Sequence, residues 1–416
     1  MTPARRAQWA WALYDWANSA FATTVIAGFF PIFFNRYWGE GLAPQTQTLW
    51  LGLTSTLASV VVMLASPLLG AIADRRGARK RFLFGFTVLG CLTTAALFLV
   101  GRGQWQWAVA LSVLGRIGFF GGLSFYDSLL LSVAHEREAD RVSALGYGLG
   151  YLGGGLLFAV NVAMALKPAM FGLADAALAT RVSFLMVAAW WLAFSLPLFL
   201  RVPERATGGA NSGWRELLAT LRAIRGMPQV WMFLVAYWLY IDGVDTIIVM
   251  AVDFGQKLGF APDRLIVALL MVQFIGFPAA IAFGRIAGRI GTRPAILAAL
   301  VVYAGVTGWA YFLQNEREFL WMAATIALVQ GGVQSLSRSL YARLIPPEKA
   351  GEFFGFYNML GKFAAVLGPL AVGVTAATTG NARASILSLL VFFAAGGALL
   401  LRVPMPSRTS SAGASA

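Results

Sequence analysis

The chain alternates between long apolar stretches and short polar connections. A helix that crosses a bilayer needs about 20 mostly apolar residues, because lipid offers no partner to backbone N–H and C=O groups. Twelve stretches meet this requirement: 8–35, 48–73, 82–101, 105–133, 142–167, 180–201, 228–252, 262–288, 294–313, 318–342, 353–376 and 382–402. The pattern therefore predicts an all-α membrane protein with twelve transmembrane helices.

The composition excludes several classes of protein. Of 416 residues, 59% are hydrophobic and 12% charged, whereas soluble domains carry about 25% charged residues. A soluble enzyme or a nucleic-acid binder of this size would have no place to bury so much apolar surface. One cysteine, Cys91, excludes a disulfide scaffold, and one histidine, His135, excludes a multi-histidine metal site. We expect no metal and no cofactor.

The 32 lysines and arginines are distributed unevenly among the polar connections. If both termini lie on one side, that side holds most of them, including the cluster at 75–81. Basic residues mark the cytoplasmic side of membrane proteins. Both termini are therefore predicted to be cytoplasmic, and the protein is expected in the inner (plasma) membrane of the cell.

A polar stretch near the middle divides the chain. We expect an N-terminal six-helix bundle at 1–201, a cytoplasmic linker at 202–227, a C-terminal six-helix bundle at 228–403 and a disordered tail at 404–416. The linker segment WRELLATLRAIR is amphipathic and basic, which is typical of a helix lying at the lipid interface. The tail is small and polar throughout.

The two halves repeat each other. The segment from Gly70 to Lys80, after the second stretch, matches the segment from Gly284 to Arg293, after the eighth. The first and seventh stretches share a second pattern, in which a tryptophan precedes two polar residues: Trp11, Asp15 and Asn18, and Trp238, Asp242 and Asp245. Duplicated halves around a site near the midplane are the architecture of secondary transporters.

The segment from Gly70 to Lys80 resembles the loop motif of the major facilitator superfamily, G-x-L-x-D-R-x-G-R-K-x, and departs from it at Ile72 and Ala78. YDWANSAF, GYGLGYLGGG and QSLSRSLYARLIP are similar to segments of the unknown major facilitator family, which is related to the fungal autophagy-related vacuolar amino-acid effluxers. The resemblance implies alternating access, with spans one, four, seven and ten lining a central cavity. It also implies a latch that holds the outward-facing state, made of Asp74, Gly77 and Arg79.

Charged residues inside the predicted spans are the main functional candidates, because a charge at the bilayer centre is costly. Six of the seven lie on spans one, four, seven and ten, and the last lies on span eleven: Asp15, Arg116, Asp127, Asp242, Asp245, Arg338 and Lys362. Asp15 and Asn18, with Tyr14 beside them, share one helical turn. We expect these three and their counterparts Asp242 and Asp245 to contribute to a substrate or ion site.

An acid surrounded by apolar groups holds a proton more readily than it does in water. At least one of Asp15, Asp242 and Asp245 is therefore a candidate for carrying a proton across the membrane. Two alternatives stay open. The acids can tie helices together without titrating, or bind sodium with neighbouring oxygens.

Span ten carries a polar stripe of Gln330, Gln334 and Arg338, spaced four residues apart. Spans four and ten also repeat, because Gly121 and Gly122 correspond to Gly331 and Gly332. In this register Asp127 corresponds to Ser337, next to Arg338, so the two charges lie at a similar depth, and we expect them to meet when a cytoplasmic gate closes. In the alternative interpretation, Arg338 binds an anionic group of the substrate.

Arg116 lies on nearly the same helix face as Asp127, eleven residues later. It resembles the superfamily's fourth-span arginine, although the expected glycine is displaced by one position, to Gly121. Lys362 and Asn358, one turn apart on span eleven, either meet an acid or an anionic substrate, or Lys362 extends to the interface. The aromatic residues expected first in the cavity lining are Trp11, Tyr14, Trp16, Trp238 and Tyr240, followed by Tyr147, Tyr151 and Tyr357.

These features favour a secondary active transporter, coupled to protons, that moves a small polar or zwitterionic solute such as an amino acid, a peptide or an amphiphilic metabolite. The alternatives are a flippase for a lipid or lipid precursor, and a sodium-coupled or uncoupled facilitator. No catalytic constellation or nucleotide-binding motif occurs in the sequence, so we expect no enzyme. The expected partners are the solute, protons or sodium, and the bilayer, and the protein is expected to be a monomer.

Overall fold

The computed structural model describes residues 2–204, 222 and 224–404. Every regular element within these residues is helical. The predicted tail, and most of the predicted amphipathic linker helix, lie outside the described residues.

The first half is built from six spans joined by short connections. Its first span contains two π-helical segments, in which the backbone hydrogen bonds reach five residues along the chain. Its helices are α1 (Pro3–Ala20), η1 (Phe21–Phe29), α2 (Phe30–Phe33), η2 (Phe34–Trp38), α3 (Pro44–Arg76), α4 (Arg79–Ala96), η3 (Leu97–Leu99), α5 (Trp105–Ser128), α6 (Leu130–Val133), α7 (Ala139–Leu166), η4 (Pro168–Phe171) and α8 (Ala176–Arg201).

The second half repeats this order. Its helices are α10 (Pro228–Lys257), α11 (Pro262–Ile290), α12 (Thr292–Tyr311), α13 (Glu316–Leu344), η5 (Pro347–Lys349), α14 (Ala350–Thr379), α15 (Ala382–Ile386) and α16 (Leu389–Arg402). In total, 12 helices of the described chain are long and apolar enough to cross a membrane. The predicted number of spans is confirmed, and each predicted stretch overlaps one of these helices.

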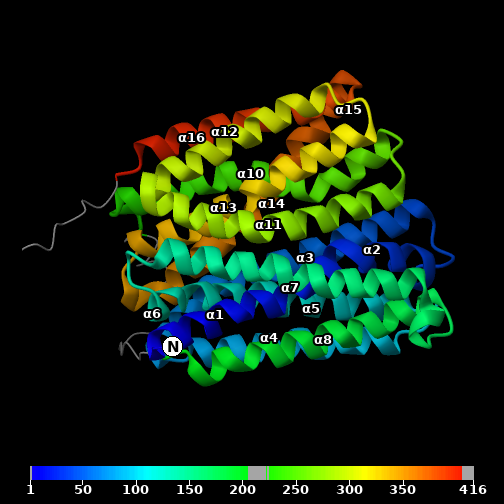
Figure 1. Ribbon diagram of the computed structural model, residues 1–416, viewed down its shortest axis with the longest axis horizontal. Coiled ribbons are helices and arrows are strands. Elements are labelled where there is room, and N and C mark those ends of the chain that lie inside the picture. Colours follow the sequence, from blue (N-terminus) through cyan, green and yellow to red (C-terminus); the bar gives the residue numbers. More distant parts are fainter. Residues whose placement is uncertain (1, 205–221, 223, 405–416) are drawn as a thin grey trace, which may run out of the picture.

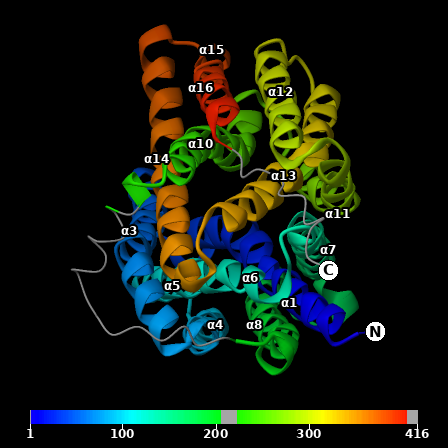
Figure 2. The same ribbon diagram turned by 90° about the vertical axis from the view of Figure 1, so that its left-hand side faces the viewer.

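The long helices run side by side along the length of the molecule (Figure 1). The first and the last described residues lie at the same end, which faces the viewer in Figure 2. We call this the terminal end and the opposite one the far end. The two halves pack against each other mainly through α7 with α11 and α3 with α14.

Each half closes at the terminal end with a similar contact. Lys80, at the start of α4, donates from Nζ to the carbonyl of Val202 at the end of α8 (2.9 Å). Arg293, at the equivalent place in the second half, donates to the carbonyls of Leu401 (3.2 Å) and Val403 (3.1 Å) after α16. Basic side chains satisfy the unpaired carbonyls at helix C-termini. The internal repeat of the sequence is thus also a repeat of contacts.

Candidate transport site

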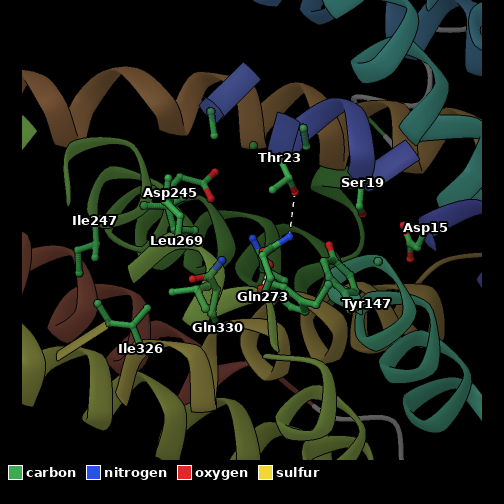
Figure 3. A pocket seen from close by; sticks show the side chains of 18 of the residues that line it. Asp15, Ser19, Thr23, Tyr147, Asp245, Ile247, Leu269, Gln273, Ile326 and Gln330 are labelled. Carbon is green, nitrogen blue, oxygen red and sulfur yellow. Dashed lines mark hydrogen bonds between the residues drawn. The ribbon is translucent and has the colours of Figure 1, made fainter. Parts of the chain in front are cut away.

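A cavity of about 400 Å³ lies between the two halves. Its wall is formed by α1, η1, α5 and α7 of the first half and by α10, α11, α13 and α14 of the second. It extends from Arg338 toward the far end, where its lining becomes apolar at Ile248, Leu265 and Phe319. Figure 3 shows side chains from both halves around this space, with Thr23 bonded to Gln273 across it (2.9 Å). Of the polar residues in the repeated pattern, Asp15, Asn18 and Asp245 line this cavity.

Arg338 lies at the boundary of the cavity on the side of the terminal end. Its Nη1 is 3.1 Å from Oδ1 of Asp127 on α5, and its Nη2 is 3.3 Å from Oδ2 of Asp15 on α1. Nε and Nη2 also donate to the hydroxyl (2.9 Å) and the carbonyl (3.0 Å) of Ser143 on α7. Arg338 is only 2% exposed. The two carboxylates offset the large cost of burying its charge.

Two further donors hold the carboxylates of this cluster. Tyr126 donates its hydroxyl to Asp15 (2.8 Å), and Asn358 of α14 donates to the second oxygen of Asp127 (3.1 Å). In this conformation Nε, Nη1 and Nη2 of Arg338 all donate to protein groups. The contact between Asp127 and Arg338 that the repeat predicted is present; that it acts as a gate stays a prediction.

Aromatic rings enclose the guanidinium of Arg338. Its central carbon lies 4.7 Å from the ring centroid of Trp11 and 4.4 Å from that of Tyr147. Cation–π contacts of this kind stabilise a desolvated arginine. The ion cluster is therefore part of the protein interior, and it separates the cavity from the terminal end.

A second pair of opposite charges lies on the cavity wall. Asp245 of α10 and Lys362 of α14 interact electrostatically. Neither forms an ion pair with another described residue. Lys362 follows Asn358 by one helical turn, which places it farther from the terminal end than the Arg338 cluster. Unlike Arg338, these two charged groups can meet a solute inside the cavity.

Eight of the predicted substrate, ion or gate residues belong to the cavity wall: Asp15, Asn18, Asp127, Asp245, Gln334, Arg338, Asn358 and Lys362. The other predicted substrate or ion residues, Tyr14, Arg116 and Asp242, do not, and neither do the latch residues Asp74, Gly77 and Arg79. Tyr14 points to α4 and bonds to Thr87 (2.9 Å). Arg116 bonds to Ser112 (3.3 Å) and lies 5.9 Å from the ring of Phe30.

Asp242 also differs from the expectation. It is 1% exposed and accepts a hydrogen bond from the backbone N–H of Gly368 (2.9 Å), which ties α10 to α14. Pro369 follows directly within α14, where a proline disturbs the helical hydrogen bonds. The contacts of Asp242 therefore agree with the alternative in which a repeated acid ties two helices together.

The first choice of aromatic lining was wrong. None of Trp11, Tyr14, Trp16, Trp238 and Tyr240 lies in the described wall of the cavity, whereas Tyr147, Tyr151 and Tyr357 do. Tyr14, Trp16 and Tyr240 lie one or two positions from a repeated acid, so they point to other faces of the helix. Trp11, four positions before Asp15, instead stacks on Tyr126 and on the guanidinium of Arg338.

The segment around Asp74 contacts the opposite half at the terminal end. Asp74 accepts hydrogen bonds from the N–H groups of Gly351 (3.0 Å) and Glu352 (2.9 Å) in the first turn of α14, and its carboxylate pairs with Arg79 (2.5 Å). Gly77 ends α3 in the left-handed conformation, at φ 55°. The three latch residues thus lie at one contact between the halves; their role as a latch stays a prediction.

A second contact between the halves at the terminal end was not predicted from the sequence. Asp140 of α7 accepts from Thr292 (2.8 Å) and Ser339 (2.5 Å) and pairs with Arg343. These residues lie near helix ends, where charged side chains are common, so their position alone does not indicate a contact between the halves. One signal was available: Gly288 replaces Asp74 in the repeat, so the second half needs a carboxylate from elsewhere. Tyr126 and Ser143 carry no comparable signal.

Comparisons with known proteins agree with this architecture. The family described as "Vacuole effluxer Atg22 like" matches residues 3–413. An uncharacterized MFS-type transporter, YxiO of Bacillus subtilis, is 35% identical over 406 residues, which cover 96% of this chain and 95% of that protein. Autophagy-related protein 22 of Yarrowia lipolytica is 29% identical over 68% of this chain. The chain spans 54% of that fungal protein's length.

Solved structures share the fold. The human organic anion transporter MFSD10 superimposes with a TM-score of 0.76 at 17% identity, over 96% of this chain and 100% of that one. The proton:xylose symporter XylE gives a TM-score of 0.75 at 13% identity, over 97% of this chain and 95% of that one. The predicted major facilitator fold is confirmed.

Proposed function

The chain belongs to the Atg22-like family of membrane transporters, and on that premise we propose that it moves a small zwitterionic solute by alternating access coupled to protons. The observation that carries the proposal is the pair of opposite charges, Asp245 and Lys362, on the wall of the cavity. Asp245 offers a partner to an ammonium group, and Lys362 offers one to a carboxylate. Amino acids, small peptides and amphiphilic metabolites carry both groups.

The occupied state of Arg338 supports this assignment of the charges. An anionic group of the solute would have to displace two carboxylates from Arg338, whereas Lys362 has no ion-pair partner among the described residues. The Arg338 cluster then has the role of the gate. Opening the terminal end requires its contacts, and those of Asp74 and Asp140, to break.

Asp15 is suited to take up a proton. Its Oδ2 accepts from both Tyr126 and Arg338, whereas its Oδ1 accepts no hydrogen bond from the residues that the structure describes, and the residue lines the cavity. With both acids ionised, the cluster of Asp15, Asp127 and Arg338 carries one excess negative charge. A proton on Asp15 neutralises that excess. Asp245 is the second candidate on the wall, and Asp242 is not exposed to the cavity.

The terminal end is proposed to face the cytoplasm, because it holds most of the lysines and arginines. The cavity, which is sealed at that end and extends toward the far end, then corresponds to an outward-facing conformation. The membrane in question is proposed to be the plasma membrane.

Transport by the full chain in proteoliposomes tests the proposal. Counterflow of a panel of amino acids, dipeptides and amphiphilic zwitterions is measured first, because exchange requires no coupling ion. Accumulation is then measured with and without a pH gradient. We expect Asp245→Asn and Lys362→Gln to lose counterflow, and Asp15→Asn to keep it while losing the response to the gradient. Glu40→Gln, an exposed acid at the far end, is the control. An absence of counterflow for the whole panel contradicts the proposed solute class, and accumulation that ignores the gradient contradicts proton coupling.

A further inference from the structure

Lys362 contacts the opposite half of the molecule through an aromatic ring. We propose that Lys362 of α14 and Phe120 of α5 form a clasp between the halves, and that an anionic group of the transported solute opens it by drawing the ammonium off the ring. This inference rests on the proposed function, and it assigns to Phe120 a role that the transport proposal does not contain.

The geometry of the clasp is that of a close cation–π contact. Nζ of Lys362 lies 3.2 Å from the ring centroid of Phe120. The ring also contacts Phe119, whose centroid is 5.1 Å away at an edge-to-face angle of 67°. The attraction arises because the face of the ring carries partial negative charge. Lys362 therefore binds a fixed group of the first half while it lines the cavity.

The clasp continues into the Arg338 cluster. One turn before Lys362, Asn358 donates to Asp127, which is two turns after Phe120 on α5 and pairs with Arg338. One segment of α14 is thus fastened to α5 at two points, and Figure 2 shows these two helices side by side. Breaking the contact of Lys362 with Phe120 therefore weakens the hold of α14 on Asp127, the neighbouring gate residue.

A solute carboxylate is a stronger partner for an ammonium than a ring, because a full negative charge replaces the partial charge of the ring face. Asp245 attracts the same ammonium from α10. A zwitterion that enters between Asp245 and Lys362 therefore gives each charge a new partner. Moving Lys362 off Phe120 then removes a contact that exists only while the halves are close.

Fluorination of the ring tests the clasp with little change of shape. Phenylalanine at position 120 is replaced by its mono-, di- and trifluoro forms, each of which weakens the negative face of the ring. The full chain carries Cys91→Ala and two spin labels, one at position 135 between α6 and α7 and one at position 289 in the last turn of α11, both of which are exposed. We expect the open-to-closed ratio at that end, without solute, to rise stepwise by about two- to thirty-fold over the series. The same series at Phe84, whose ring has an edge-to-face contact with Phe199 within the first half, is the matched control and should leave the ratio unchanged.

Three small molecules test the role of the anion. L-valine, a zwitterion, and isovalerate, a carboxylate without the amine, should raise the open-to-closed ratio of the unfluorinated protein, and their affinity should increase along the series at position 120. L-valinamide, which lacks the carboxylate, should not respond to fluorination. A ratio that does not change with fluorination at position 120, or that changes equally with fluorination at position 84, overturns the clasp. A ratio that follows fluorination but responds to neither carboxylate overturns its opening by an anion. Failure of the proposed transport itself appears separately, as the absence of counterflow.

Discussion

Asp74 on α3 and Gly351 at the start of α14 are joined by a hydrogen bond of 3.0 Å from the backbone N–H of Gly351 to Oδ1 of Asp74. A carboxylate at a helix N-terminus meets unpaired N–H groups and the positive end of the helix dipole. On the same helix face, Gly70 lies so close to the carbonyl of Gly351 that a side chain at position 70 would displace it. This contact is available only while the terminal end is closed.

Replacing Asp74 by asparagine should weaken closure of the terminal end. The amide loses the ion pair with Arg79 and offers one acceptor where the carboxylate offers two, and hydrogen bonds to charged groups contribute about 1.5–3 kcal/mol each. We expect the closed-to-open ratio, measured by spin labels at positions 135 and 289, to fall by about tenfold or more. Asp175→Asn, which changes a helix cap at the far end, serves as the control. An unchanged ratio would show that Asp74 is not a latch.

The contacts of Asp74 and Asp140 should contribute additively to closure. Asp74 binds the start of α14, whereas Asp140 binds Thr292, Ser339 and Arg343, so these contacts of the described residues are separate. Effects at independent sites add within about 0.3–0.5 kcal/mol. The double variant Asp74→Asn with Asp140→Asn should therefore lose the sum of the two single effects in the same spin-label measurement. A double variant no worse than either single one would mean that both acids act on one contact.

Removing Arg338 should be more harmful than removing Asp127. Arg338→Gln leaves two buried carboxylates without their counter-charge, and breaking a buried ion pair costs about 3–5 kcal/mol. Asp127→Asn leaves Arg338 paired with Asp15 and still offers an oxygen to it. We expect the thermal midpoint in detergent to fall clearly further for Arg338→Gln, and Asp15→Asn combined with it to restore part of the loss. Equal thermal midpoints for the two single variants would contradict the role of Arg338 as the counter-charge of both carboxylates.

Gly146→Ala should disturb the Arg338 cluster directly. A Cβ at this position would lie 2.6 Å from Oδ2 of Asp15 and 3.1 Å from Nη2 of Arg338. One of the two groups has to move, so closure of the terminal end and counterflow should both fall. The control is Gly85→Ala, whose Cβ would meet no atom within 4 Å. Wild-type counterflow in Gly146→Ala would mean that the cluster tolerates displacement.

Glu204, which lies outside the membrane-spanning helices, should make the stability of the protein depend on pH. It accepts from the backbone N–H of Lys80 (3.2 Å), and burial raises its pKa above the ordinary value, against the lowering effect of that hydrogen bond. The folded protein therefore binds this proton more tightly than the unfolded chain, and the stability contributed by Glu204 falls as the pH rises between the two pKa values. Glu204→Gln removes this term. Its thermal midpoint relative to wild type should rise with pH above about 4.5. If the difference in thermal midpoint between Glu204→Gln and wild type stays constant from about pH 4 to about pH 7, the pKa of Glu204 is not raised in the folded protein.

Much of the candidate site could be anticipated because lipid restricts where charges occur. Asp127 and Arg338 were paired from the repeat alone, since equivalent positions on duplicated helices lie at similar depth. Asp242 could not be separated from Asp245 in this way. The two are three residues apart, and only the packing of α10 against α14 decides that the first binds Gly368 while the second faces the cavity.

The amino-acid sequence by itself determined the number of helices, the duplication and the set of charged residues inside the spans, because the apolar stretches and the repeat are properties of the chain. Tertiary structure alone decided which charges meet. Arg338 has two carboxylate partners from two other helices and Lys362 has a ring from the opposite half. These pairings depend on how far each helix is rotated about its axis, and that rotation is set by the close packing of all its neighbours.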